Sequence, residues 1–319
     1  MKRATITIII PVYNVENFVN ETLLSVKNQI SQPDEVIVID DGSTDGSSNI
    51  LDKYIDLHGW KIIHTPNQGL GLTRNFGRSI AISEYIYFLD SDDTIEQNLI
   101  FRMRSVIEEY DNPDMILFSG ETLENNLSLR KKMNLKLTLR GKYSSGSALI
   151  RELLNRKEAF PQASRYITKK ILWSENKLYY PNCIYEDEAV FFPLLTLSKN
   201  IVVIPEIYLK YRIGRVDSLT NITPSAKHAI SYLHIINFII KFMSSNPELV
   251  KVDPTVWRYR LGRNGLKYVS MCLRTDTYIS WKMIIILFLK VKSLRYPFKL
   301  IWRVLKFFLL NFLNNNSKT

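Results

Sequence analysis

The chain has 319 residues, 46% of them hydrophobic, which is enough to bury a sizeable core as one large domain or two smaller ones. Its formal net charge of +11 is concentrated in residues 251–319, which hold 14 Lys or Arg and two Asp or Glu. The remainder is near neutral, which argues against a nucleic-acid groove and favours a C-terminal contact with an anionic surface. Two cysteines without other ligands at zinc spacing argue against a disulfide framework and a zinc site.

The first hundred residues alternate between two hydrophobic patterns. β-Branched and apolar runs predict strands, and helical spacing predicts helices between them; the strands are expected at 5–12, 35–39, 60–64 and 85–89, and the helices at 16–29, 47–57 and 69–82. The first apolar run is short and lacks a cleavage site, so it predicts a buried strand rather than a signal peptide. This alternation predicts a mostly parallel sheet that binds ligands beyond the carboxyl ends of its strands.

The later part of the chain is less regular. No run reaches the roughly 18 consecutive apolar residues of a membrane-spanning helix. The patterns predict a strand at 115–119, an exposed loop or hairpin at 123–142, a helix at 145–155, an acidic and then apolar helix at 184–197, short strands at 201–205 and 207–211, and basic helices after about Asn221.

An acidic cluster, Asp90-Ser91-Asp92-Asp93, directly follows the predicted strand at 85–89. Adjacent carboxylates repel each other unless a cation or solvent compensates. Mg²⁺ and Mn²⁺ prefer oxygen ligands and bridge to phosphates, so one interpretation is a metal site that neutralises a leaving diphosphate. The other is a solvated turn that caps the next helix.

Two further polar motifs follow predicted strands. Asp40-Asp41-Gly42-Ser43 offers carboxylates to a base or ribose, or forms an ordinary turn. The segment 67–75 contains two glycines, which permit close approach to a ligand, and Arg74, which suits a phosphate. It lacks the Gly-Lys-Ser/Thr ending of a P-loop.

The motifs IPVYN, VIDDGSTDGS, NQGLGLTRNFG and YFLDSDD, in this order, resemble the family 2 glycosyltransferases, a large inverting group with the GT-A fold. The resemblance is dense from Thr5 to about Asn98 and thinner to Asn221. It implies an α/β fold with a Rossmann-like, mostly parallel sheet flanked by helices. The expected domains are a catalytic domain at 1–220, with a nucleotide-binding half at 1–98 and an acceptor half at 99–220, and a helical, basic extension at 221–319.

The resemblance also implies roles for single residues. Asp90-Ser91-Asp92 matches the family's Asp-x-Asp motif, with Asp92 as the best ligand for Mn²⁺ or Mg²⁺ and Asp90 as its donor-binding neighbour. Asp93 is expected at the donor sugar. The nucleoside is expected at Pro11, Tyr13 and Asp41, and the loop that contacts the nucleotide contains Arg74.

A catalytic base is implied at Tyr185-Glu186-Asp187-Glu188, which resembles the family's Glu-Asp pair ahead of an apolar helix. An inverting transfer needs one carboxylate to take the acceptor's proton, and Asp187 is the predicted base. Glu186 and Glu188 leave the register open, and an acid-rich helix N-terminus is the alternative. Arg212 lies in a later Tyr-Arg segment that resembles the family, where it is expected to close over the diphosphate unless its role is structural.

The C-terminal stretch predicts a basic amphipathic helix that begins at Pro297. Such a helix suits a membrane interface, and packing on the catalytic body is the alternative. A companion is expected at 281–289. The apolar positions are Phe298, Ile301, Trp302, Leu305, Phe308, Leu309 and Phe312, and the basic ones are Lys299, Arg303 and Lys306.

These observations predict a hexosyltransferase that moves a hexose or amino-hexose from a UDP-sugar to a glycan, expected to be lipid-linked, in bacterial capsule, O-antigen or lipopolysaccharide synthesis. Its expected place is cytoplasmic, on the inner face of the membrane, with an anionic membrane surface as partner and no nucleic acid. One alternative is a membrane-binding protein with a non-catalytic GT-A-like domain. Another is a sugar-phosphate nucleotidyltransferase, which would need a glycine-rich loop where PVYNVENF stands. A processive synthase would need spanning helices and a Gln-x-x-Arg-Trp motif.

Overall fold

The computed structural model describes residues 3–124, 135–214, 223–292 and 296–302. The chain divides into two compact units. The first, here called the sheet unit, comprises Met1–Asn182 and Val190–Asn221; the second, the helical unit, comprises Cys183–Ala189 and Ile222–Thr319.

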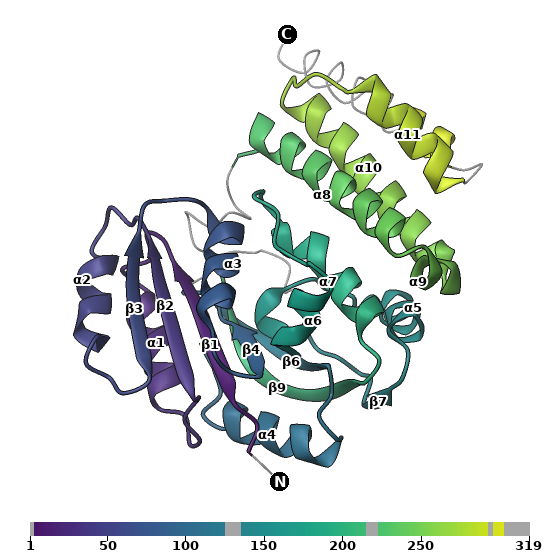
Figure 1. The fold of residues 1–319 in the computed structure, drawn as a ribbon. Helices are drawn as coiled ribbons and strands as arrows, with labels where there is room; N and C mark the ends of the chain where they lie inside the picture. The colour runs from purple at the N-terminus through teal and green to yellow at the C-terminus, as the bar shows by residue number, and fades with distance from the viewer. Residues whose placement is uncertain (1–2, 125–134, 215–222, 293–295, 303–319) are drawn as a thin grey trace. The chain divides into compact units, whose positions relative to one another are not determined.

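A nine-stranded mixed sheet forms the centre of the sheet unit (Figure 1). Its order is β3-β2-β1-β4-β8-β6-β9-β5, and β7 pairs with β9. Strands β1 to β4 run parallel, whereas β8 is antiparallel to both β4 and β6. The strands are β1 (Ile6–Val12), β2 (Glu35–Asp41), β3 (Trp60–Thr65), β4 (Tyr85–Phe88), β5 (Thr94–Ile95), β6 (Met115–Glu124), β7 (Gly141–Tyr143), β8 (Tyr166–Lys169) and β9 (Ile201–Ile213).

Helices cover the two faces of this sheet. Because side chains alternate along a strand, Ile8 and Ile10 of β1 join the buried core that includes α1 and α4, while Ile9 faces α3. The helices are α1 (Val19–Lys27), α2 (Ser47–Leu51), α3 (Leu70–Ile80), α4 (Leu99–Glu109), α5 (Gly146–Arg156), α6 (Lys170–Glu175) and α7 (Glu186–Leu197), with 3₁₀ turns at η1 (Asp52–Tyr54) and η2 (Ala163–Arg165).

Helix α3 packs closely on the sheet because Gly77 has no side chain. A Cβ at Gly77 would lie 2.5 Å from Cγ2 of Ile9 and 2.9 Å from Cδ1 of Ile39. We expect Gly77→Ala to lower the free energy of unfolding by about 1–3 kcal/mol, the usual result of overpacking a core. Chemical denaturation measures the change, and Ser79→Ala, on the exposed side of the same helix, is the control. An equal effect of both substitutions would contradict this packing.

The parallel pairing brings three strand ends to one edge of the sheet. Val12 is paired with Asp40, and Asp41 with Thr65, while Ile9 is paired with Phe88 near the end of β4. The polar motifs that follow β1, β2 and β4 therefore begin at the same edge, as the sequence predicts.

The predicted α/β class is confirmed, with differences in the acceptor half. The two short strands expected at 201–205 and 207–211 are one strand, β9, whose pairing with β6 is irregular around Ser119. The expected exposed loop or hairpin at 123–142 is wrong in part, because β6 continues into it and three alternate leucines are buried: Leu135, Leu137 and Leu139. The elements β5, β8, α4 and α6 were not predicted.

The helical unit is built around α10 (Pro254–Arg274), which lies between α8 (Ala226–Ser245) and α11 (Trp281–Val291) (Figure 1). The short α9 (Pro247–Val252) connects α8 to α10. Phe242 and Trp257 hold α8 and α10 together with ring centroids 4.9 Å apart. A last helix covers 296–302, and Tyr296 packs against Gly262 and Gly265 of α10. Within the described ranges, no helix has both the length and the apolar composition to cross a bilayer.

Candidate active site

Asp41 holds the glycine-containing loop at the end of β2. Its two carboxylate oxygens accept hydrogen bonds from the backbone N–H groups of Gln68 (2.8 Å) and Gly69 (2.9 Å). The adjacent Gly42 has a φ of 71°, and a Cβ there would lie 2.7 Å from the nitrogen of Asn67. The two predicted nucleotide loops are therefore in direct contact, and Asp41, only 3% exposed, connects them.

The two predicted nucleoside contacts from β1 differ in exposure. Pro11 is buried within the strand, whereas the Tyr13 side chain is 48% exposed just beyond it. An exposed aromatic ring beside a strand end is available to stack on a base. The roles of Pro11, Tyr13 and Asp41 at the nucleoside stay predictions.

Asp40 is the centre of a separate hydrogen-bond network. It accepts bonds from the Ser43 backbone N–H (2.9 Å) and the Ser48 hydroxyl (2.5 Å), and it pairs with His64 Nδ1 at 2.9 Å. Burial of Asp40 opposes its ionisation, but these hydrogen bonds outweigh burial and lower its pKa. The network fixes the turn after β2.

The His64 side chain makes stability depend on pH. Its hydrogen bond to Asp40 raises the pKa of His64, and partial burial lowers it. Asp52, 3.1 Å from Nε2, raises the pKa further. The stabilisation is complete below the unfolded pKa of about 6.5 and is lost as pH rises through the higher folded value. We expect His64→Gln to cost more stability at pH 6 than at pH 8.5, by under about 1 kcal/mol because the ring is partly exposed.

Chemical denaturation of wild type and variant at both pH values measures this difference. The exposed His58→Gln serves as the control substitution. A cost for His64→Gln that is larger at pH 8.5 would show that the Asp40 pair does not stabilise protonated His64.

Arg74 forms an ion pair with the acidic cluster. From α3, its guanidinium contacts Oδ1 of Asp90 at 2.5 Å, and the Arg74 side chain is only 2% exposed. The guanidinium also lies 5.3 Å from the ring centroid of Tyr180. A buried Arg–carboxylate pair is rigid, so it fixes the start of the acidic loop relative to the glycine-containing loop. The structure thus brings Arg74 and Asp90 together, and their donor contacts stay predictions.

Asp93 is fully buried, with 0% exposure. Its Oδ1 accepts a hydrogen bond from the Arg212 backbone N–H at 2.8 Å, and Ser164 Oγ lies 3.5 Å from Oδ2. Burial, together with Asp92 and Asp90, raises the pKa of Asp93 well above its ordinary value. The structure therefore gives Asp93 a role in holding β9, and its predicted contact with the donor sugar stays untested.

Arg212 also contacts the loop that contains the acidic cluster. Its Nε donates to the Asp92 carbonyl oxygen at 2.8 Å, and its guanidinium contacts Glu21 at 2.5 Å and lies 4.9 Å from the Phe18 ring centroid. This supports the structural alternative raised by the sequence, because the side chain is only 4% exposed. A movement of Arg212 over the diphosphate stays a prediction.

The residues present suit a hard divalent cation bound partly by substrate. In the described residues no group of three or more Asp, Glu, His or Cys side chains is placed to hold a metal. Mg²⁺ is commonly bound through one or two carboxylates with substrate phosphates and water completing its shell. Asp92, partly exposed between Asp90 and Asp93, fits that arrangement. Binding of Mn²⁺ or Mg²⁺ remains a prediction.

The predicted base belongs to the helical unit. Asp187 lies in the first turn of α7, and its Oδ1 accepts a hydrogen bond from the Glu188 backbone N–H at 2.9 Å. Glu186 is buried, at 3% exposure. Glu188 forms ion pairs with Arg260 and Lys267, and although burial opposes its ionisation, these cations lower its pKa. A carboxylate so engaged is a poor proton acceptor, which favours Asp187 over Glu188.

Several residues around these motifs were not predicted. The Thr22 hydroxyl lies 2.9 Å from the Ser91 carbonyl oxygen and 2.7 Å from that of Asp93. Tyr180 and Ser164 support Arg74 and Asp93 as described above. Local patterns contain no signal for such contacts, because the partners are between 69 and 106 residues apart in the chain.

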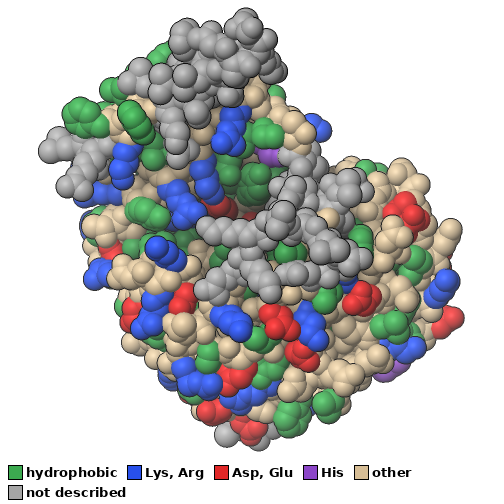
Figure 2. Space-filling view, turned by 180° about the vertical axis from the view of Figure 1, so that it is seen from behind, with side chains coloured by type: hydrophobic (Ala, Val, Ile, Leu, Met, Phe, Trp, Pro, Cys, Tyr) green, Lys and Arg blue, Asp and Glu red, His purple; other side chains and the backbone are tan. Residues whose placement is uncertain are grey.

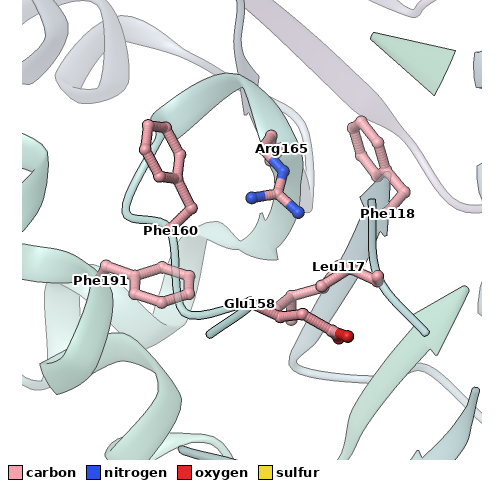
Figure 3. A pocket seen from close by; sticks show the side chains of 7 residues that line it. Leu117, Phe118, Glu158, Phe160, Arg165 and Phe191 are labelled. Carbon is pink, nitrogen blue, oxygen red and sulfur yellow. The ribbon is translucent and has the colours of Figure 1, made fainter. Parts of the chain in front are cut away.

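A small cavity lies apart from these motifs, between β6, η2 and α7 (Figure 3). Phe160 and Phe191 line it on one side and Leu117 and Phe118 on the other, with the Arg165 guanidinium between them. Burial lowers the pKa of Arg165 to about 10. The cavity volume of about 10 Å³ holds roughly one water molecule, so it cannot receive a sugar.

Comparison with known proteins identifies the family. The model of glycosyl transferase family 2 matches residues 7–172. The chain belongs to this family. An uncharacterized glycosyltransferase of Haemophilus influenzae is 32% identical over 235 residues, which cover 71% of this chain and 86% of that protein. The predicted family and the prediction of a glycosyltransferase are thereby confirmed.

Other relatives match over a smaller part of their own length. The putative glycosyltransferase EpsH of Bacillus subtilis is 38% identical over 104 residues, 32% of this chain and 30% of EpsH. Among solved structures, S. aureus TarS 1-349 in complex with UDP-GlcNAc has a TM-score of 0.59 at 20% identity, covering 94% of this chain and 89% of that chain. This likeness confirms the GT-A-like fold.

Proposed function

We propose that this chain transfers a sugar from a UDP-sugar, with inversion, to a hydroxyl group of a glycan acceptor in bacterial surface-polymer synthesis. The observation that carries the proposal is the contact of the two predicted nucleotide loops through Asp41, together with the Arg74–Asp90 pair. The complex of TarS with UDP-GlcNAc supports a UDP-sugar donor. Poly(ribitol-phosphate) beta-glucosyltransferase of Bacillus spizizenii is 30% identical over 230 residues, which cover 69% of this chain and 34% of that protein. Its name supports a surface polymer as the acceptor.

The reaction is a single displacement at the anomeric carbon. The acceptor oxygen forms the new bond to that carbon as the bond to the diphosphate oxygen breaks, and UDP leaves with the electron pair. The acceptor's proton passes to the carboxylate of Asp187. Pro11, Tyr13 and Asp41 bind and orient the nucleoside. Asp92 would hold a divalent ion, which would neutralise charge on the diphosphate when bound.

A donor panel tests the proposal. UDP-, GDP- and dTDP-sugars are compared by calorimetric titration and by nucleotide release in the presence of Mn²⁺. We expect a UDP-sugar to bind and to release its nucleotide. UDP-GlcNAc and UDP-glucose are the first donors to test. Preference for GDP- or dTDP-sugars would overturn the donor assignment, and no binding of any donor would overturn the proposed activity.

We also propose that α11 and the last helix contact an anionic membrane surface, which suits a lipid-linked acceptor. Trp281, Ile285 and Leu289 are spaced at i, i+4 and i+8 and are 65%, 59% and 68% exposed, while the other face of α11 packs on α10. In 296–302, Phe298 and Trp302 are 73% and 65% exposed. In Figure 2, hydrophobic and basic side chains are exposed together on this unit. The predicted positions 303–312 lie outside the described residues.

Vesicle co-sedimentation tests the membrane contact. The double substitution of Trp281 and Leu289 to Ser should reduce binding to phosphatidylglycerol-containing vesicles by more than tenfold, since each side chain contributes about 1.5–3 kcal/mol when buried. Binding should also fall with salt and be weak on phosphatidylcholine alone. Ile55→Ser, an equally exposed apolar site in the sheet unit, is the matched control. Undiminished binding of the double variant would show that α11 does not enter the interface.

A further inference from the structure

The turn that contains Asp187 packs among helices that follow it by 40 to 80 residues. Within the helical unit, the backbone N–H of Ile184 donates to Ser231 Oγ on α8 at 2.9 Å. The Tyr185 ring stacks on the Tyr232 ring of the same helix, with centroids 5.4 Å apart and planes at 27°. The side of the turn before Asp187 is therefore attached to α8.

The other side of the turn is attached to α10 through Glu188. Arg260 donates to both the carbonyl oxygen (3.0 Å) and the carboxylate (3.2 Å) of Glu188, so it holds main chain and side chain together. Lys267, about two helical turns further along α10, pairs with the second carboxylate oxygen. The Arg260 and Glu188 side chains are only 2% and 15% exposed, so little solvent competes for these bonds.

Tyr185 shows why this attachment is needed. Its φ of 66° lies in the left-handed region, which is strained for an aromatic residue and persists only where the surroundings enforce it. Lys267 Nζ lies 5.2 Å from the centroid of the Tyr232 ring that stacks on Tyr185. Lys267 therefore contacts both attachments, the ring pair on one side of Asp187 and the carboxylate on the other.

We propose that Glu188, Arg260 and Lys267 are positioning residues, which hold the Asp187 turn on α10 and, through the contact of Lys267 with Tyr232, on α8, in the geometry for proton abstraction. This inference rests on the proposed role of Asp187 as the base. It assigns the C-terminal helices a part in catalysis beyond any contact with a membrane, and it explains why the acidic motif contains a third carboxylate that is not a base.

Lys267→Met is the variant that separates positioning from folding. It keeps the length of the side chain and leaves Arg260 to neutralise Glu188, so no buried charge loses its counter-charge. Lys267→Arg is the conservative variant expected to restore wild-type behaviour. Lys251→Met is the matched control, because Lys251 also pairs with a glutamate, Glu248, but on the exposed α9.

Amide hydrogen exchange of residues 183–189 gives the first readout, which does not depend on activity. We expect Lys267→Met to exchange about tenfold faster there than wild type, with Lys267→Arg and Lys251→Met unchanged. Unchanged exchange in Lys267→Met would overturn the proposal.

Turnover gives the second readout, with UDP-GlcNAc as the probe and water as acceptor. Lys267→Met should lower kcat for UDP release by about 10–100-fold while the Kd for UDP-GlcNAc stays within about twofold, and Lys267→Arg should recover it. Faster exchange with unchanged kcat would show that the attachment does not serve the reaction. If wild type releases no nucleotide from any donor of the panel, the proposed function fails, and hydrogen exchange still decides the attachment.

Discussion

Asp187→Asn should lower the rate of sugar transfer by about 10²–10⁴-fold, the usual contribution of a general base. The asparagine oxygen can still accept the Glu188 N–H bond that Asp187 accepts at 2.9 Å, so the turn should keep its shape. It cannot take the acceptor's proton, however. The expected signature is a fall in kcat with an unchanged Kd for the UDP-sugar, measured by steady-state nucleotide release and by calorimetric titration.

The two neighbouring acids are compared with Asp187. Glu188→Gln removes the charge opposite Arg260 and Lys267, so it should lower both thermal stability and kcat, while the acid limb of the pH–rate profile should remain. Glu186→Gln should reduce kcat less than Asp187→Asn. If Glu186→Gln is instead the more damaging substitution with donor binding intact, the base is Glu186 and the register of the motif must shift by one residue.

The nucleotide-binding half of the fold was predictable because its signals are local. Strands β1 to β4 are rich in β-branched and aromatic residues, and parallel pairing sends the polar residues that follow them to one edge. The positions of Asp41 and Asp90 at that edge follow from this rule alone. What each carboxylate binds does not follow, because its partner belongs to another segment of the chain: Gln68 in the loop before α3 for Asp41, and Arg74 on α3 for Asp90.

The acceptor half was less predictable because its pairing is between distant segments. Strand β8 lies between β4 and β6 and is antiparallel to both. No local sequence pattern predicts this pairing. One signal was present and overlooked: the alternation of Leu135, Leu137 and Leu139 has the period of a half-buried strand, although basic residues surround it. The attachment of Glu188 to α10 joins residues 72 and 79 positions apart, and only the folded helices reveal it.

Asp92→Asn should abolish the dependence of donor binding on Mn²⁺. The three carboxylates of the acidic cluster have different surroundings, which is why this one is singled out. Asp90 is paired with Arg74 at 2.5 Å, and Asp93 is fully buried with Oδ1 on the Arg212 backbone. Asp92 is partly exposed, and Arg212 fixes its backbone by donating to its carbonyl oxygen at 2.8 Å. Its partial exposure and its place in the Asp-x-Asp motif make Asp92 the carboxylate that we expect to meet a cation shared with a diphosphate.

The measurement is a titration of UDP-GlcNAc with Mn²⁺ present and after chelation. Wild type should lose about 100-fold in affinity on chelation, consistent with the several kcal/mol that a metal contributes to a charged phosphate group, whereas Asp92→Asn should bind weakly under both conditions. Glu96→Gln neutralises an acid four residues away that pairs with Lys210 on the surface, and it should behave as wild type. Retained Mn²⁺ dependence in Asp92→Asn, with its loss in Asp90→Asn, would assign the metal to Asp90 and require Arg74 to release that carboxylate when donor binds.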